Sequence, residues 1–365
     1  MEDYVQLDGS IGEGGGQVLR VALAISAVLG KPLHITNIRR KRQNPGLRNQ
    51  HLTAVTAVQK ACSAQVKGAF IGSTELYFSP GRISTSRLEL DTGTAGSTTL
   101  VLQSLLPVLC FGPRLTSFSV RGGTNNPNAP TYEYFEQVFL PSVAPMGLDV
   151  ELRLLKRGFY PRGNGIVSGL CRPVRKLSPI NLTGEPKVVK VVGIAYTSRL
   201  PSHVAERMAK TCEKHLVEKG YENVFIEKEV LTEVDAKCAL DAGAGICLVA
   251  VCENGVRIGV DRLGEKGVPA EKVGQAAAED LVSELQQKAP VDRHLGDMLS
   301  IYAALADGRS VYEVTKLTNH TLTSVQLCQI LAGCKARVHG SLNERGMIEI
   351  DGIGFVNKNL ADANA

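Results

Sequence analysis

The sequence repeats a series of landmarks, and this internal repeat constrains the fold more than any other feature. Asn44-Pro45 returns as Asn126-Pro127, an offset of 82 residues, and the segments around each pair match at the same offset. One strand–helix unit cannot bury its sheet face alone, so we expect the copies to pack around a shared core. The first copy comprises helix 17–29, strand 33–38, Asn44-Pro45 and helix 48–62, and the second comprises helix 96–110, strand 115–120, Asn126-Pro127 and helix 131–145.

A third and weaker copy lies near the C-terminal end. Residues 294–306 and 321–333 have helical periodicity, and the segment 310–316 between them is strand-like. The loop before the second helix carries Thr318-Asn319-His320 where the earlier copies carry Asn-Pro. The copies are predicted to close with strands, which are expected near 67–79, 149–172, 335–340 and 346–355.

The long segment between the second and third copies has a different order of elements. The Asn-Gly pair of Glu253-Asn254-Gly255 separates two strand-like segments, which predicts a hairpin. We therefore expect an inserted α/β domain that follows a linker at 178–186. Its elements are expected at strand 187–197, helix 203–219, strands 223–230, 246–252 and 256–261, and helix 270–287.

The predicted fold class is α/β, with a large domain of three strand–helix repeats and a smaller inserted α/β domain. Hydrophobic residues make up 44% of the chain and charged residues 21%, as in ordinary globular domains, so extensive disorder is excluded. The expected division is 1–182 for repeats one and two, 183–278 for the inserted domain, and 279–365 for repeat three with the C-terminal tail.

Composition excludes several classes of protein. The nine cysteines form no Cys-x-x-Cys pair, which argues against a disulfide framework and a zinc site. No apolar run is long enough for a membrane span, and the acidic start Met1-Glu2-Asp3-Tyr4 lacks an apolar signal region, so we expect an intracellular protein. The net charge of +5 permits a nucleic-acid partner without requiring one. The absence of Trp disfavours recognition by base stacking.

A glycine-rich segment at 8–17, DGSIGEGGGQ, leads directly into the first predicted helix. Backbone amides at such a helix start, with few Cβ atoms around them, form an anion site. The spacing matches neither a Walker A loop nor a dinucleotide-binding fingerprint. Glu13 can hold a divalent ion there, because magnesium near phosphates usually takes one or two protein carboxylates. A tight turn with a solvated Glu13 is the simpler interpretation, and spacing alone leaves both open.

A basic segment, Arg39-Arg40-Lys41-Arg42, is followed by Arg48, Gln50 and His51. Arginine forks match phosphate oxygens, so a phosphate clamp is one interpretation. A solvated loop or a nuclear-import signal is the other, because runs of charge usually face water.

One histidine of the seven stands out by its position. His320 lies at a loop-to-helix junction, and its neighbours Asn319, Thr321, Thr323 and Ser324 can cap the helix and anchor the loop. The histidines and cysteines have no metal-ligand spacing, so a metal role for His320 is not expected. The segment 157–165, RGFYPRGNG, is interpreted most simply as a turn between strands.

Taken together, these segments resemble the RNA 3'-terminal phosphate cyclase family over residues 4–356. The resemblance implies a large domain of three units, similar to those of enolpyruvyl transferases, with an inserted α/β domain. It also implies ATP-dependent conversion of an RNA 3'-phosphate to a 2',3'-cyclic phosphodiester, through adenylyl-histidine and RNA-adenylate intermediates, with release of pyrophosphate and AMP. The motifs are LDGSIGEGGGQVLR (7–20), IRRKRQNPGLRNQH (38–51), TAGSTTLVLQ (94–103), GGTNNPNAP (122–130), RGFYPRGNG (157–165), HLGDML (294–299), TNHT (318–321) and GIGF (352–355).

The resemblance also implies roles for single residues. His320 matches the adenylylated nucleophile, a task that suits imidazole because it is largely neutral at pH 7. Glu13 matches the glutamate that binds Mg²⁺ or Mn²⁺. Which arginine serves ATP and which serves RNA stays open. The implied ATP-binding residues are Arg20, Gln50, Gln103, His294, Leu295 and Asp297, and the implied RNA-phosphate-binding residues are Arg39 and Arg42.

Two other functions occur on such repeats. A non-catalytic, cyclase-like branch that acts in ribosomal RNA processing lacks the histidine and the glutamate that this chain carries as His320 and Glu13. Enolpyruvyl transferases carry six units in two equal domains, whereas this chain has three units and one unlike insert. The implied partners are ATP and an RNA with a 3'-terminal phosphate, with no membrane. The implied location is the nucleus in a eukaryote and the cytoplasm otherwise.

One departure from the family pattern is visible at Gly163-Asn164-Gly165, where three consecutive glycines are usual. Asparagine tolerates a positive φ better than most residues. We therefore expect this turn to keep its geometry.

Overall fold

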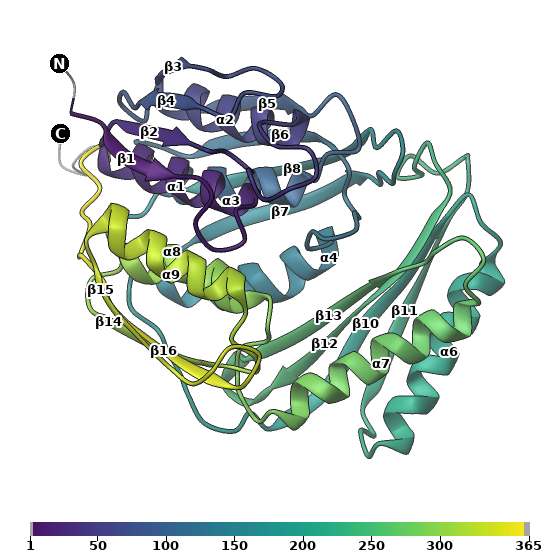
Figure 1. Cartoon of the computed structure of the whole chain (residues 1–365). Helices are drawn as coiled ribbons and strands as arrows, with labels where there is room; N and C mark the ends of the chain where they lie inside the picture. Colours follow the sequence, from purple (N-terminus) through teal and green to yellow (C-terminus); the bar gives the residue numbers. More distant parts are fainter. Residues whose placement is uncertain (1–2, 361–365) are drawn as a thin grey trace.

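Three four-stranded sheets in the computed structural model, which describes residues 3–360, share one plan (Figure 1). Their strand orders are β1-β2-β4-β3, β5-β6-β8-β7 and, in the same direction, β9-β14-β16-β15. In each sheet the first two strands are parallel and the later pairs are antiparallel. The bounds are β1 Val5–Asp8, β2 Leu33–Thr36, β3 Gln65–Lys67, β4 Leu76–Ser79, β5 Arg87–Asp91, β6 Thr116–Gly122, β7 Asp149–Lys156, β8 Gly165–Arg172, β9 Asn181–Leu182, β14 Arg309–Val314, β15 Lys335–His339 and β16 Gly346–Asp351.

The third sheet takes its first strand from a distant part of the chain. Asn181 and Leu182 of β9 pair in parallel with Val311 and Tyr312 of β14. The inserted segment therefore interrupts the third unit after its first strand, whereas the sequence analysis placed the third copy wholly after the insert. The division at 182/183 and 278/279 stays a prediction, with residue 278 lying inside α7 (Ala270–Gln286).

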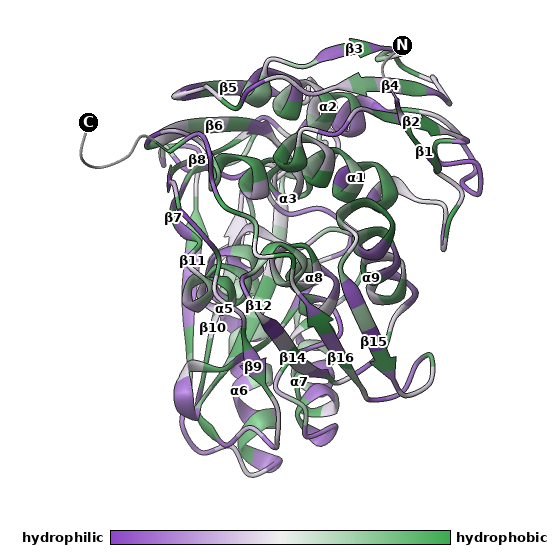
Figure 2. Cartoon of the chain, turned by 90° about the vertical axis from the view of Figure 1, so that its left-hand side faces the viewer, coloured by the Kyte–Doolittle hydropathy of each residue, from purple (hydrophilic) through white to green (hydrophobic). Residues whose placement is uncertain are grey.

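Five helices lie between the three sheets and form the centre of the core (Figures 1 and 2). In α1 the buried side chains occur on every side of the helix, as expected for an element packed all round. The helical patterns at 17–29, 48–62, 96–110, 294–306 and 321–333 are confirmed to within two residues. The bounds are α1 Gly16–Leu29, α2 Asn49–Cys62, α3 Thr98–Leu109, α8 Leu295–Leu305 and α9 Asn319–Ala332.

The second helix of the second copy differs from its prediction. One regular helix over 131–145 is wrong, because the segment changes its hydrogen-bond pattern several times. The N–H of Leu140 donates to the oxygen of Phe135, a wide π-type turn, and Pro141 has no N–H to continue a regular helix. The segment comprises α4 Tyr132–Tyr134, a π-helix Phe135–Phe139, α5 Leu140–Val143 and a 3₁₀ turn Ala144–Met146.

The inserted segment folds into a fourth sheet with strand order β11-β10-β12-β13. Two helices, α6 and α7, cover one face of it and share a second hydrophobic core (Figure 1). Its edge strand β13 meets the large domain, where the Gly259 N–H donates to Asp292 Oδ2 at 3.1 Å. No helix of residues 3–360 is long and apolar enough to cross a membrane. The bounds are β10 Val188–Ser198, α6 Ser202–Glu218, β11 Val224–Leu231, β12 Gly243–Cys252, β13 Arg257–Leu263 and α7 Ala270–Gln286.

Candidate active site

The first turns of α1, α2, α8 and α9 meet at one place. Gln17, the second residue of α1, contacts Asp297 of α8 and His320 of α9. Gly16, which begins α1, packs against His51 in the first turn of α2. A helix N-terminus presents unpaired N–H groups and the positive end of the helix dipole. Side chains already accept N–H groups at the starts of α8 and α9, whereas α1 has no side-chain cap, so the start of α1 is the end that most favours a bound anion.

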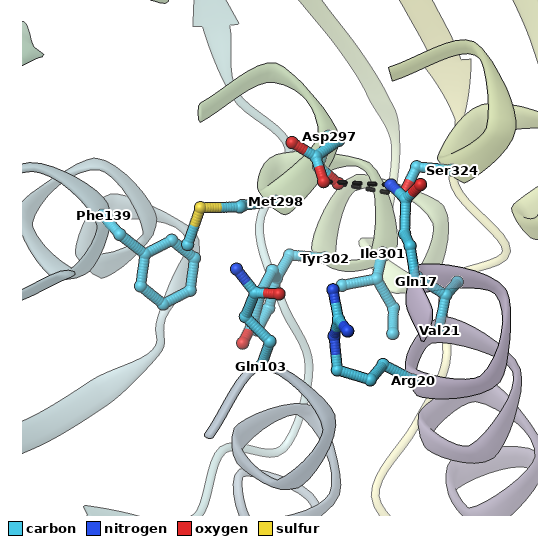
Figure 3. Close-up of a pocket in the computed structure, with 10 residues that line it drawn as sticks. All are labelled: Gln17, Arg20, Val21, Gln103, Phe139, Asp297, Met298, Ile301, Tyr302 and Ser324. Carbon is cyan, nitrogen blue, oxygen red and sulfur yellow. Dashed lines mark hydrogen bonds between the residues drawn. The ribbon is translucent and has the colours of Figure 1, made fainter. Parts of the chain in front are cut away.

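A pocket beside these helix ends combines an apolar wall with a few polar groups (Figure 3). Side chains of α1, α3 and α8 form most of it, and the π-helical segment adds Phe139. Apolar walls with a small number of convergent polar groups are typical of sites for small molecules. The lining residues are Gln17, Arg20, Val21, Gln103, Phe139, Asp297, Met298, Ile301, Tyr302 and Ser324.

The carboxamide of Gln17 links three of the four helices. Its Nε2 donates to Asp297 Oδ2 at 3.0 Å and to the backbone oxygen of His320 at 2.8 Å. Its Oε1 lies 2.8 Å from His320 Nδ1. Ser324 adds to the same cluster, because its Oγ donates to the backbone oxygen of Asp297 at 3.1 Å. Gln17 is 5% exposed, so the arrangement is held inside the protein rather than at its surface.

His320 is the accessible member of this cluster, and the cap of α9 holds it in place. Thr318 Oγ1 accepts the Thr321 N–H at 3.1 Å at the start of the helix. While His320 Nδ1 faces Gln17, Nε2 lies 3.3 Å from Glu13 Oε2 in the glycine-rich loop. The side chain is 44% exposed, so Nε2 lies where a ligand can approach.

The glycine-rich loop packs closely against side chains of α9 and of the basic segment. Gly12 has a φ of +59°, and a Cβ there would collide with the Thr323 side chain of α9. Lys41 Nζ donates to the Gly12 oxygen at 2.7 Å, and Arg42 approaches Glu13 Oε2 at 3.1 Å. The loop therefore brings Glu13 between a histidine and an arginine, and it brings the basic segment to the same anion site.

Positive groups surround the other side of Gly16. Burial lowers the pKa of Arg20 to about 10, although Asp297 partly offsets this, and the Arg20 guanidinium stays charged at neutral pH. Arg20 Nε is buried and has no hydrogen-bond partner among residues 3–360. Burial, helped by Arg20, Arg39 and Arg48, lowers the pKa of His51 to about 3, so His51 is neutral. An unpaired arginine donor at an anion site is the group that a phosphate oxygen would satisfy.

The buried His51 gives a pH-dependent term in the free energy of unfolding. Below the unfolded pKa of about 6.5, the unfolded chain binds a proton that native His51 does not bind, so stability falls as the pH falls toward 3. Between pH 7 and pH 5 this residue should remove about 2 kcal/mol. Denaturant unfolding of wild type and His51→Gln at both pH values checks this, with the variant losing about 2 kcal/mol less. The exposed His203→Gln should keep the wild-type dependence, and an equal loss in wild type and His51→Gln would contradict the expectation.

Gln103, Asp297 and His294 were also expected at the site. Gln103 and Asp297 line the pocket, and burial raises the pKa of Asp297 while His320, His294 and Arg20 oppose that rise. His294 is the N-cap residue immediately before α8, and its ring meets the Tyr134 ring edge-on, with 6.4 Å between the ring centroids.

Three expected residues contact the protein itself. The Leu295 side chain is buried in the core, 1% exposed, and the Leu295 N–H donates to Asp292 Oδ1 at 3.0 Å. The Arg39 guanidinium donates to the backbone oxygens of Asn44 and Gly46 at 2.8 Å each. Gln50 Oε1 accepts the Ser97 N–H at 3.2 Å, so it fastens the basic segment to the second repeat.

The sequence analysis did not include several residues of the pocket among its site residues. Gln17, Ser324, Phe139 and Met298 line the pocket, and His51 lies beside it. Gln17 is the last residue of the glycine-rich segment 8–17, and His51 is the last residue of the motif 38–51. Their place in these segments was the signal that could have identified them. Met298 lies within the quoted motif HLGDML but was not singled out, and Phe139 carries no signal in sequence, because an apolar side chain at helical spacing looks like ordinary core.

Metal-binding side chains are sparse here. Among residues 3–360 no group of three or more His, Cys, Asp or Glu side chains could hold a metal ion. Glu13 is the carboxylate nearest to His320 Nε2 and to the glycine-rich loop. A cation bound at Glu13 would therefore take most of its ligands from a bound phosphate and from water, as Mg²⁺ commonly does.

Comparison with known proteins gives consistent matches over almost the whole chain. Residues 11–338 match the family model described as RNA 3'-terminal phosphate cyclase. A protein of that name from Staphylothermus marinus is 45% identical over 97% of this chain and 99% of its own length. The protein of the same name from Caldivirga maquilingensis is 43% identical over 89% of this chain and 92% of its own length. The one from Pyrococcus furiosus is 40% identical over 94% of this chain and 98% of its own length.

Proposed function

The chain belongs to the RNA 3'-terminal phosphate cyclase family, and from that premise we propose that it converts an RNA 3'-terminal phosphate to a 2',3'-cyclic phosphodiester with ATP. The position of His320 carries the proposal. This imidazole is accessible, is oriented by Gln17, and lies at a junction of helix N-termini beside Arg20 and Arg42. A nucleophile placed among anion-binding groups is what attack on a phosphate requires.

The first step forms a covalent adenylyl enzyme. A nitrogen of His320 attacks the α-phosphorus of ATP, a P–N bond forms, and the bond to pyrophosphate breaks with its electron pair on the leaving oxygen. Arg42 lies close to Glu13 and His320, where it meets charge that develops on the phosphates. The N-terminal turns of α1 and α9 face the same region, and they add partial positive charge without reorganisation.

The second and third steps use the activated phosphorus. An oxygen of the RNA 3'-phosphate attacks the adenylyl phosphorus, and the P–N bond breaks to release His320. The neighbouring ribose 2'-oxygen then attacks the 3'-phosphorus and expels AMP, while its proton passes to solvent. These steps need positioning and cationic groups more than further covalent chemistry.

We assign the nucleotide to the pocket between α1, α3 and α8. Phe139 and Met298 offer apolar surface to a base, and Gln103 and Asp297 offer polar groups at its edge (Figure 3). Arg20, with a free buried Nε, lies between this pocket and His51, so we assign Arg20 to phosphate oxygens. We assign Arg42 to the RNA phosphate or to the triphosphate, which share one chemistry. We assign Arg39 an indirect role, because its guanidinium holds the backbone of the loop at Asn44 and Gly46.

Glu13 is the residue that would hold a divalent cation, Mg²⁺ or Mn²⁺, together with phosphate oxygens. The donor set fits, because one carboxylate adjoins an anion site and no competing cage of ligands exists within residues 3–360. Such an ion supplies charge neutralisation at the departing pyrophosphate.

Product analysis tests this function directly. A short RNA with a 3'-phosphate, incubated with the protein, ATP and Mg²⁺ or Mn²⁺, should gain a 2',3'-cyclic end, which resists phosphatase and yields to acid. The matched RNA with a 3'-hydroxyl should stay unchanged. Chelation of the cation should slow the reaction strongly, and Glu13→Gln should raise the cation concentration needed for half-maximal rate. Cyclisation that proceeds equally without ATP would contradict the proposal.

A further inference from the structure

The direction in which the Gln17 carboxamide points is determined by its neighbours. Its nitrogen lies 3.0 Å from a carboxylate oxygen of Asp297 and 2.8 Å from the backbone oxygen of His320. Both groups accept hydrogen bonds, since the carboxylate is ionised or shares one proton and a carbonyl has none to give. A flipped amide would place its own oxygen against these two acceptors. The NH₂ group therefore faces Asp297 and His320, and Oε1 faces the imidazole.

The tautomer of His320 follows from that orientation. Gln17 Oε1 can only accept a hydrogen bond, and it lies 2.8 Å from His320 Nδ1. Nδ1 must therefore carry a proton for the contact to be attractive. In a neutral imidazole only one nitrogen carries a proton. The contact of Nδ1 with Gln17 Oε1, at 2.8 Å, is shorter than that of Nε2 with Glu13 Oε2, at 3.3 Å, so we place the proton on Nδ1 and the lone pair on Nε2. Histidine in water favours the opposite tautomer, so the protein has to impose this one.

We propose that Gln17 is a positioning residue that holds His320 in the tautomer with Nδ1 protonated and Nε2 free to act as the nucleophile. The proposal rests on the proposed function, because it concerns which atom of His320 attacks ATP. Nε2 is the correctly placed atom, since it faces Glu13 and the glycine-rich loop on the accessible side. Nδ1 faces the protein interior and a glutamine that is 5% exposed.

The same contact serves the covalent step. Nε2 forms the new bond to the α-phosphorus, pyrophosphate leaves with the electron pair of the broken P–O bond, and Nδ1 keeps its proton. The ring then carries a positive charge, and its hydrogen bond to Gln17 Oε1 becomes charge-assisted and stronger. Gln17 thus stabilises the transition state more than the ground state, which raises the rate rather than ATP affinity. Asp297 and the backbone of His320 keep the amide from rotating.

The tautomer can be read directly from the full-length protein. Nitrogen-15 NMR of histidine-labelled protein, recorded at alkaline pH without ATP or metal and assigned with His320→Asn, separates protonated from unprotonated ring nitrogens. Wild type should show Nδ1 protonated and Nε2 unprotonated at His320. A wild-type signal with the proton on Nε2 would overturn the proposal whatever any variant does.

Variant kinetics supply the second readout. Gln17→Met keeps the length of the side chain and removes its hydrogen bonds, so the His320 signal should move toward the Nε2-protonated form. The rate of adenylylation at saturating ATP should fall about 10²-fold, since general positioning of a nucleophile contributes on this scale. The ATP concentration for half-maximal rate should change less than about threefold. The same replacement at exposed Gln275 of α7 should leave both unchanged.

The outcomes separate this inference from the proposed function. If wild type becomes labelled on His320 but Gln17→Met has wild-type rate and tautomer, the role of Gln17 is wrong and the cyclase function stands. If Gln17→Met loses ATP binding as much as rate, Gln17 acts on the pocket and the positioning role is likewise wrong. If wild type is never labelled, the proposed function fails, while the NMR spectrum still decides the tautomer.

Discussion

Replacement of His320 with alanine is expected to remove covalent labelling of the protein by ATP that carries a radioactive α-phosphate. Labelling should fall at least about 10³-fold, as it does when the nucleophile of a covalent mechanism is deleted. We expect no other imidazole to take its place, because neutral His51 is 5% exposed and the His294 ring packs against Tyr134. Gel autoradiography of the denatured protein measures the loss.

The chemistry of the bond adds a second observation. A phosphoramidate on histidine is stable in alkali and is lost in mild acid, unlike a phosphate ester on serine. Wild-type label should therefore disappear on acid treatment and survive in base. Label from β- or γ-labelled ATP should be absent, since pyrophosphate leaves.

A matched control is available in the inserted domain. His203 is exposed on α6, outside the residues assigned to the site, so His203→Ala should be labelled like wild type. His320→Ala should keep its thermal unfolding midpoint within a few degrees, because the side chain is 44% exposed. Undiminished labelling of a folded His320→Ala would show that the nucleophile lies elsewhere.

Replacement of Arg157 with methionine is expected to destabilise the protein by about 3–5 kcal/mol. Arg157 is 1% exposed, and its guanidinium contacts Glu133 at 2.7 Å and Glu229 at 2.5 Å. It also lies over the Tyr196 ring at 4.0 Å. Burial lowers the pKa of Arg157, but the two carboxylates outweigh burial and raise it above its ordinary value. Methionine would leave the Glu133 carboxylate buried without the positive charge of Arg157 beside it.

The position of this group explains why its loss matters. Glu133 belongs to the large domain, whereas Tyr196 and Glu229 belong to β10 and β11 of the insert. Asn125 joins both sides, because its Nδ2 donates to Glu133 at 2.8 Å and to the Tyr196 hydroxyl at 2.9 Å. The buried charges thus fasten the insert to the second repeat, and Arg157→Met should loosen that junction.

Denaturant unfolding of three variants distinguishes the buried pair from ordinary ion pairs. Arg172→Met removes an exposed arginine that pairs with Asp149 and Glu151, so it should cost less than about 1 kcal/mol. Adding Glu133→Gln to Arg157→Met should recover part of the loss, because it neutralises the unpaired buried carboxylate. Equal effects of Arg157→Met and Arg172→Met would show that burial does not strengthen the Arg157 contacts.

Much of this architecture is visible in periodicity. Apolar spacing marks the helices because a helix buried between sheets needs apolar side chains around its surface, and α1 and α3 show that pattern strongly. The repeat offset predicts which elements correspond. By contrast, β9 has two residues, too short for any pattern, and only its pairing with β14 reveals its place. The π-type turn at Phe135–Phe139 likewise has no sequence period of its own.

The site residues likewise divide into those that sequence patterns predict and those that only the fold brings together. His320 and Glu13 stand in motifs whose residue types suit the proposed chemistry, so sequence reasoning finds them. Gln17 and Asp297 are 280 residues apart, and a hydrogen bond between them cannot be deduced from spacing. Leu295 and Arg39 look like ligand residues within their motifs, yet their contacts are with the protein itself.

The sequence by itself determined the repeated strand–helix units, the inserted segment and the glycine-rich loop, and it predicted the type of nucleophile. These features are local, because they depend on periodicity, turn residues and side-chain chemistry within short segments. Only the tertiary structure decided that four helix N-termini meet, that β9 completes the third sheet, and that the Gln17 amide faces His320 Nδ1. Those features depend on how distant segments pack, and a hydrogen bond between helices exists only after packing has brought its donor and acceptor within reach.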